Sequence, residues 1–79
     1  MREQWQRFLD DNESNWNYGI VPELVERLAE AIDARDYVEI SYLLDSLYYQ
    51  GVMLDDNDNL CFVADYIYLF RVDADSDET

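Results

Sequence analysis

PELVERLAEAID, which spans Pro22–Asp33, predicts an amphipathic helix. Proline is favoured at the first helical position, so the helix is expected to start near Pro22. At about 100° per residue, its apolar side chains fall within roughly a third of the circumference: Leu24, Val25, Leu28 and Ile32. The opposite side carries an acidic row, with Arg27 as its single positive neighbour. This acidic row consists of Glu23, Glu26, Glu30 and Asp33.

The residues before this helix predict one shorter helix and a loop. Residues 2–11 place apolar side chains at i, i+3 and i+4, the spacing of a helix that buries one face: Trp5, Phe8 and Leu9. Residues 12–21 are rich in Asn and contain Gly19, a composition typical of loops. The chain is therefore expected to begin with two helices joined by an irregular segment.

A third helix is expected over residues 36–50. Asp36 has the chemistry of an N-cap, and Glu39 stands three residues later as the other half of a capping box. Gly51 suits the position just beyond the last turn. One side of this helix is apolar: Ile40, Leu43, Leu44 and Leu47. Because the other side is also largely apolar or aromatic, the helix should lie centrally or partly at an interface; that side carries Val38, Tyr42, Asp45 and Tyr49.

The segment LCFVADYIYLFRV, residues 60–72, is compatible with two structures. Its β-branched and aromatic content favours a hairpin in which 52–54 pair with 60–63 across a DDND turn. Thirteen residues without a turn signal are long for a strand in so small a domain. A helix capped by Asn59 gives a regular apolar stripe, and we prefer it: Leu60, Val63, Ile67 and Phe70.

These elements predict one mainly α domain over residues 1–72, a small bundle of about four helices. The alternative is an α+β domain with a C-terminal β-hairpin. Residues 73–79 are polar and acidic, and we expect a disordered tail there. The N-terminal segment lacks an apolar run of signal-peptide length and no stretch approaches a membrane span, so we expect a cytoplasmic protein.

The chain has a net charge of −14, with nineteen Asp and Glu, five Arg, no Lys and no His. Without the four acids of the tail, residues 1–72 still carry −10. A nucleic-acid-binding protein should show a basic patch, and a peripheral membrane protein should show a basic amphipathic helix. Neither is present, so we expect no direct binding to nucleic acid or membrane. The expected partner is a basic protein.

The residue types needed for common catalytic and metal sites are missing. Without His there is no nucleophile–histidine pair or usual zinc site, and without Lys there is no Schiff base. Cys61 stands alone and is expected to be a small core residue. Asp55, Asn57 and Asn59 have calcium-loop spacing, but Leu60 follows where Gly is needed. We therefore expect no enzyme, no cofactor and no metal.

The acidic row is the best candidate for a working surface. Its charges follow each other at about 4.5–6 Å, against about 3.4 Å for successive phosphates of one DNA strand. An acidic helix face is usually just solvated. Here, however, the Lys residues that normally interleave with Glu are missing. The supporting acids would extend the row if the helices pack as a bundle: Asp10, Asp11, Asp36 and Glu39.

Small size, strong acidity, many Tyr and Trp residues and a helical pattern resemble phage-encoded DNA-mimic inhibitors, such as Ocr-type anti-restriction and small anti-CRISPR proteins. The resemblance covers composition and pattern over the whole chain and includes no motif. It implies a non-catalytic inhibitor that occupies the DNA-binding groove of a CRISPR effector or restriction enzyme, in the cytoplasm of an infected cell. Tyr42 and Tyr49 are candidates for apolar anchoring at its rim.

The alternative function is an acidic protein-binding module, such as an antitoxin or a chaperone-like adaptor. In that case exposed aromatic side chains would contribute more to binding than charge, because aromatic residues are enriched in interface hot spots. A homodimer is compatible with the small core and the Tyr-rich third helix.

Overall fold

The computed structural model describes residues 2–15 and 19–67. Its helices are α1 (Glu3–Asp11), the short 3-10 helix η1 (Glu13–Asn15), α2 (Ile20–Ala34) and α3 (Tyr37–Tyr49). The strands β1 (Val52–Leu54) and β2 (Leu60–Phe62) form an antiparallel hairpin, and residues 63–67 are helical. The prediction of a mainly α fold is confirmed, and the small sheet is the hairpin of the α+β alternative.

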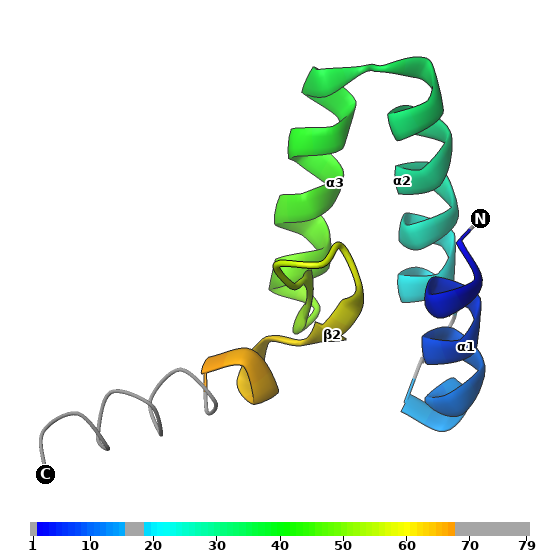
Figure 1. Cartoon of the computed structure of the whole chain (residues 1–79), viewed down its shortest axis with the longest axis vertical. Coiled ribbons are helices and arrows are strands. Elements are labelled where there is room, and N and C mark those ends of the chain that lie inside the picture. The colour runs from blue at the N-terminus through cyan, green and yellow to red at the C-terminus, as the bar shows by residue number, and fades with distance from the viewer. Residues whose placement is uncertain (1, 16–18, 68–79) are drawn as a thin grey trace, which may run out of the picture.

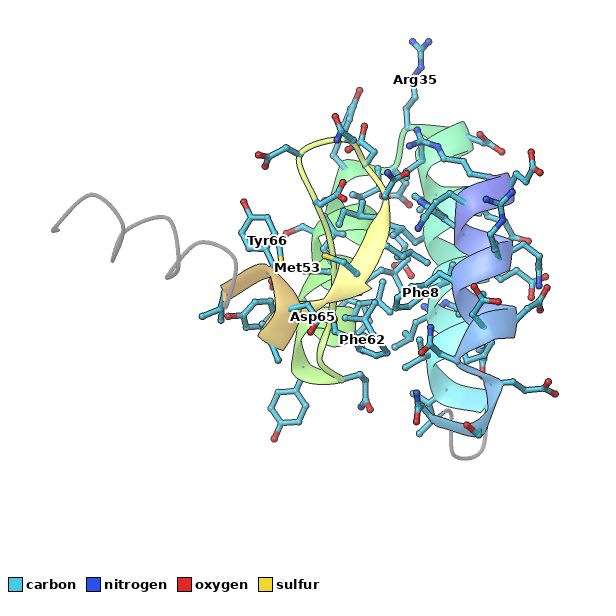
Figure 2. The ribbon with its side chains drawn as sticks, turned by 60° about the horizontal axis from the view of Figure 1, so that its bottom comes forward. Phe8, Arg35, Met53, Phe62, Asp65 and Tyr66 are labelled. Carbon is cyan, nitrogen blue, oxygen red and sulfur yellow. The ribbon has the colours of Figure 1, made fainter. Side chains whose placement is uncertain are left out.

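The helices α2 and α3 run antiparallel side by side, and α1 lies along α2 (Figure 1). The hairpin packs β1 against the C-terminal end of α3 and β2 against α1. The hairpin therefore bridges α1 and α3. Phe8 of α1 and Phe62 of β2 face each other across this contact, with ring centroids 5.1 Å apart (Figure 2).

The helix α2 begins earlier than its proline suggests. It starts at Ile20, so Pro22 lies within the first turn rather than at the first position. The residue before it, Gly19, has a φ of 69°, in the left-handed region that glycine enters at no steric cost. The chain can therefore turn sharply into α2 at this point, and part of the predicted loop becomes helix.

The Asp36 half of the predicted capping box of α3 is confirmed, but the Glu39 half is not: the Glu39 carboxylate pairs with Arg27, and the Asp36 N–H donates to the carbonyl of Ala31. The Asp36 side chain accepts a hydrogen bond from the backbone N–H of Glu39 at 3.2 Å. At the other end, Gly51 has a φ of 86° and follows the last turn, as its position in the sequence indicated. Both signals are local, which is why they could be identified from the sequence.

The preference for one helix over residues 60–72 is wrong for its first part. Leu60–Phe62 pairs with Val52–Leu54, with Met53 opposite Cys61, and the helical conformation starts only at residue 63. The objection to the hairpin was that a strand of thirteen residues is too long for this domain. It does not apply, because the strand has only three residues and a helix follows it. Phe70 and the rest of that segment lie outside the described residues.

The turn between the strands is organised by Asp55 and not by the expected helix cap, Asn59. Its Oδ1 atom accepts hydrogen bonds from the N–H groups of Asn57 at 2.8 Å and Asn59 at 3.0 Å. A short acidic side chain that binds the backbone two residues ahead favours a turn over a helix. Asp58 completes the turn with a φ of 61°.

Two side chains of α1 fix the hairpin in place. The Gln4 amide exchanges two hydrogen bonds with the Leu60 backbone, donating to its carbonyl at 3.3 Å and accepting from its N–H at 2.9 Å. The Trp5 indole Nε1 donates to the carbonyl of Asp58 at 2.8 Å. Because Gln4 pairs with β2 much as a third strand would, it satisfies backbone groups that an edge strand leaves open.

The core lies between α2, α3 and the layer formed by α1 and the hairpin. Trp5 is its largest fully buried side chain, and every described element except η1 and the helical residues 63–67 contributes to it. The buried residues are Trp5, Leu9, Val21, Val25, Leu28, Ala31, Leu43, Leu47, Val52 and Leu60.

We expect Asp36→Ala to destabilise the fold by about 1 kcal/mol, because the cap of α3 is lost. For a domain of this size the melting temperature should fall by about 4–8 °C, measured by circular dichroism. Asp36→Asn is the matched control, since it removes the same charge but keeps a side chain that can cap. Equal melting temperatures for the two variants would contradict the capping role.

Candidate protein-binding surface

The acidic row forms a continuous exposed face of α2. Glu23, Glu26, Glu30 and Asp33 are all exposed, while Val25 and Leu28 on the other side are fully buried. The row advances over ten residues, which corresponds to about 15 Å along the helix axis. The predicted division of α2 into a core face and an acidic face is therefore what the structure shows.

One further acid extends this face from the neighbouring helix. Gln6 of α1 and the row residues Glu26, Glu30 and Asp33 line a shallow groove between α1 and α2. Gln6 donates a hydrogen bond to Asp10 Oδ1 at 3.0 Å, one turn further along α1. Because α1 runs antiparallel to α2 (Figure 1), Asp10 lies on the flank of α1 that continues toward the start of the row.

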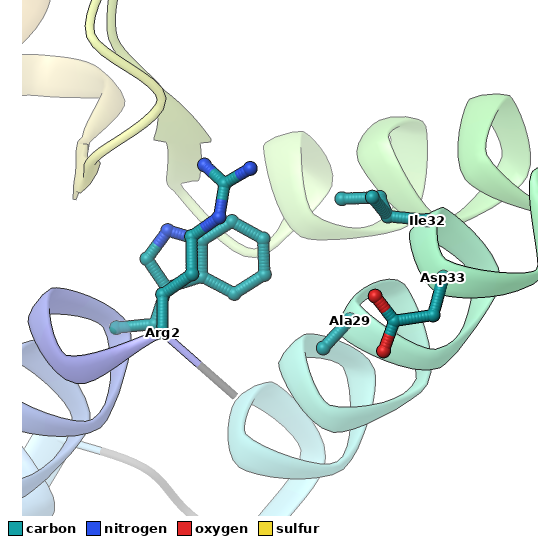
Figure 3. Close-up of a pocket in the computed structure, with 5 residues that line it drawn as sticks. Arg2, Ala29, Ile32 and Asp33 are labelled. Atoms are coloured by element: carbon teal, nitrogen blue, oxygen red, sulfur yellow. The ribbon is translucent and has the colours of Figure 1, made fainter.

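Arg2 lies near the far end of the row. A pocket of about 180 Å³ is lined by Arg2, which precedes α1, by Trp5 of α1, and by Ala29, Ile32 and Asp33 of α2. Figure 3 shows Arg2 and Asp33 on opposite sides of it. The Arg2 guanidinium stacks on the Trp5 ring, 5.2 Å from its centroid. This stacking holds the cation over the ring, and its ion pair is with Asp58 at 3.8 Å.

Three of the four arginines in the described part of the chain pair with acids outside the row. Arg27, which follows Glu26 in sequence, reaches across to Glu39 of α3 at 2.6 Å. Arg7 pairs with Glu3 at 3.2 Å. Arg35 extends away from the body at the turn between α2 and α3 (Figure 2). Within residues 2–15 and 19–67, no ion pair involves any carboxylate of the row.

The structure does not bring all the predicted supporting residues to this face. Asp11 lies about 100° further round α1 than Asp10, away from the groove. Asp36 caps α3, and the charge of Glu39 is offset by Arg27. Asp36 and Glu39 nevertheless line a shallow pocket together with Glu30 of the row and Arg27, so both lie beside the row, whereas Asp11 does not.

The predicted aromatic anchors lie on α3, outside the row. Tyr42 and Tyr49 are exposed, together with Tyr37, Val38 and Tyr48 on the same helix. The side of α3 that its sequence marked as partly aromatic is exposed, and the role of Tyr42 and Tyr49 as apolar anchors stays a prediction. Gln6 was not among the predicted site residues, and its spacing of four residues from Asp10 was the available signal.

Two titrating groups of the hairpin region are shifted by their surroundings. Burial raises the pKa of the Cys61 thiol, and the carboxylates of Asp55 and Asp65 raise it further. The negative charge of Asp56, which accepts a hydrogen bond from the Tyr66 hydroxyl at 3.3 Å, raises the pKa of Tyr66. Both shifts favour the neutral form, so neither group is activated as a nucleophile at neutral pH.

Among the described residues, no group of three or more acids or cysteines is arranged to hold a metal ion. No helix in that part of the chain combines the length and the apolar character needed to cross a bilayer. Comparison of the sequence and structure with protein-family models, curated proteins and solved structures found no match.

Proposed function

We propose that this protein is a DNA mimic that occupies the basic nucleic-acid-binding groove of a host defence protein, such as a CRISPR effector or a restriction enzyme. The observation that supports this most strongly is the exposed acidic row of α2, none of whose members forms an ion pair in the described chain. Asp10 extends it from α1. The carboxylates of this face lie in a line and are available to pair with the cationic side chains of a basic groove.

The length of the row fits this role. About 15 Å of helix corresponds to about four or five steps of one DNA strand. The carboxylates are sparser than the phosphates of a duplex, so the face resembles a single strand's charge more closely. Binding should release anions from the basic groove, as DNA does, and should weaken steeply with salt.

The test is competition with DNA on purified targets. A panel of CRISPR effectors and restriction enzymes is incubated with labelled duplex and increasing amounts of this protein, and bound duplex is measured by gel mobility. We expect displacement from at least one target, with an inhibition midpoint that rises in proportion to the duplex concentration. A complex that forms equally well on a DNA-occupied target would contradict the proposal.

A second candidate is the acidic protein-binding module, which the exposed aromatic face of α3 favours. Tyr49 is 89% exposed and Val38 84% exposed, and large apolar surfaces of this kind mark protein-binding sites. Binding through that face should change little between low and physiological salt, whereas binding through the acidic row should weaken steeply over the same range. Salt dependence therefore separates the two functions.

A further inference from the structure

A groove of about 400 Å³ lies between α3 and the hairpin, on elements other than those that carry the acidic row. Its apolar lining comes from Leu44 and Tyr48 of α3 and from Met53 and Leu54 of β1. Met53 is visible on the hairpin in Figure 2. Volumes of this order, with mainly apolar linings, are typical of binding clefts.

Three carboxylates border this apolar lining: Asp45 of α3 and Asp55 and Asp58 of the turn. Asp45 forms no ion pair within the described chain. Asp58 lies 3.8 Å from Arg2, but both side chains are more than half exposed, so this ion pair is weak. Asp55 holds the turn through its Oδ1 atom alone in the two side-chain hydrogen bonds that it accepts. The groove thus combines an apolar floor with an anionic rim.

The apolar surface continues beyond the groove along α3. Tyr37 and Ser41 precede Tyr48 by eleven and seven residues, which places all three on one flank of the helix. Tyr37 is 74% exposed and Tyr48 57% exposed. An arginine that passes over such rings can stack on them as well as pair with a neighbouring carboxylate. A ligand bound in the groove can therefore also contact this flank of α3, which enlarges the binding surface.

Charge complementarity selects the occupant. A second copy of this chain, with its net charge of −14, would bring further carboxylates to an anionic rim. The chain's own residues 73–79 carry four acids and no cation, so they are repelled in the same way. We infer that the groove binds a basic amphipathic helix of a partner protein, with Leu, Phe or Met entering the groove and Arg or Lys flanking them.

This site goes beyond the proposed DNA mimicry, because it lies on a different surface and requires apolar side chains from the partner. A phosphate-binding groove recognises charge alone, whereas this groove should require charge and apolar residues on defined faces. Peptides can therefore test it without any knowledge of the protein that the acidic row binds.

The experiment uses three fluorescein-labelled peptides of fourteen residues and measures their anisotropy with the full chain at 150 mM NaCl. The first is an amphipathic helix of Leu and Arg, the second has the same composition with the two residue types scrambled, and the third has Glu in place of Arg. We expect the first to bind at least tenfold more tightly than the scrambled peptide, and no binding of the third. Equal binding of the first two would overturn the inference.

Matched variants locate the site. Tyr48→Ala should weaken binding of the amphipathic peptide about fivefold to twentyfold, as for an interface anchor. Tyr49→Ala removes the same side chain from an exposed position outside the groove and should leave binding unchanged. Met53→Ala, on the other wall, should act like Tyr48→Ala. Circular dichroism confirms that each variant is folded, and equal effects of the two tyrosine variants would contradict the assignment.

Binding should also be independent of the acidic row. Glu23→Gln, Glu26→Gln and Glu30→Gln combined should change the affinity for the amphipathic peptide less than threefold, since the row lies on α2. A loss as large as that of Tyr48→Ala would show that the peptide binds the acidic row instead. Failure of DNA competition with intact peptide binding would count only against the proposed DNA mimicry.

Discussion

Trp5→Ala is expected to leave much of the protein unfolded at 25 °C. Trp5 is 1% exposed and is the largest fully buried side chain, and its replacement by alanine typically costs about 3–5 kcal/mol. A domain of this size has a total stability of about 4–12 kcal/mol, and self-repulsion at a net charge of −14 reduces it. Urea unfolding followed by circular dichroism measures the loss.

The Trp5 indole also joins α1 to the hairpin, and a second variant isolates that contribution. Trp5→Phe keeps an aromatic ring but removes the donor to the Asp58 carbonyl, so it should cost less, about 1–3 kcal/mol. A control substitution at an exposed aromatic position, Tyr42→Ala, should change stability by less than about 0.5 kcal/mol. A Trp5→Ala variant as stable as the parent would contradict the observed packing of α1.

Neutralising the acidic row should reduce binding to a basic nucleic-acid-binding groove by about tenfold to hundredfold. This estimate assigns about 0.5–1 kcal/mol to each charge lost in the combined Glu23→Gln, Glu26→Gln and Glu30→Gln variant. The slope of log affinity against log salt should also become shallower, by up to about one for each charge removed. Titration of a target found by DNA competition, at several salt concentrations, measures both quantities.

The control for this variant changes the same net charge elsewhere. Asp11→Asn, Glu13→Gln and Asp65→Asn combined remove three exposed acids that lie outside the row. If position matters, this control should bind within about threefold of the parent. Equal losses for the two triple variants would mean that only net charge matters, and the acidic row would no longer be a specific site. Neither variant should lose stability, because fewer like charges repel each other.

Much of the helical part of the fold could be predicted from the sequence, because its causes are local. The spacing of Leu24, Val25, Leu28 and Ile32 places the core face of α2, and the acids necessarily fall opposite. The cap at Asp36 acts over three residues, and Gly51 enters the left-handed region where a helix must end. These relations need no knowledge of any distant segment.

The error over residues 60–72 has a long-range cause. Both helix and strand suited the local composition, and the strand at Leu60 is held by Gln4, 56 residues earlier in the chain. The indole of Trp5 binds the turn at Asp58 over a similar separation. Helical periodicity contains no information about such contacts, so only the packed chain could select the hairpin.

The sequence by itself determined the net charge and the existence of the acidic row, since both follow from residue type and helical spacing. The tertiary structure decided which acids keep an unpaired charge. It directs Arg27 to Glu39 and Arg2 to Trp5 and Asp58, away from pairing with the row. It also placed β1 beside α3 and so created a groove between them. The physical reason is that ion pairs and grooves depend on distances between elements, which the packing of the core sets.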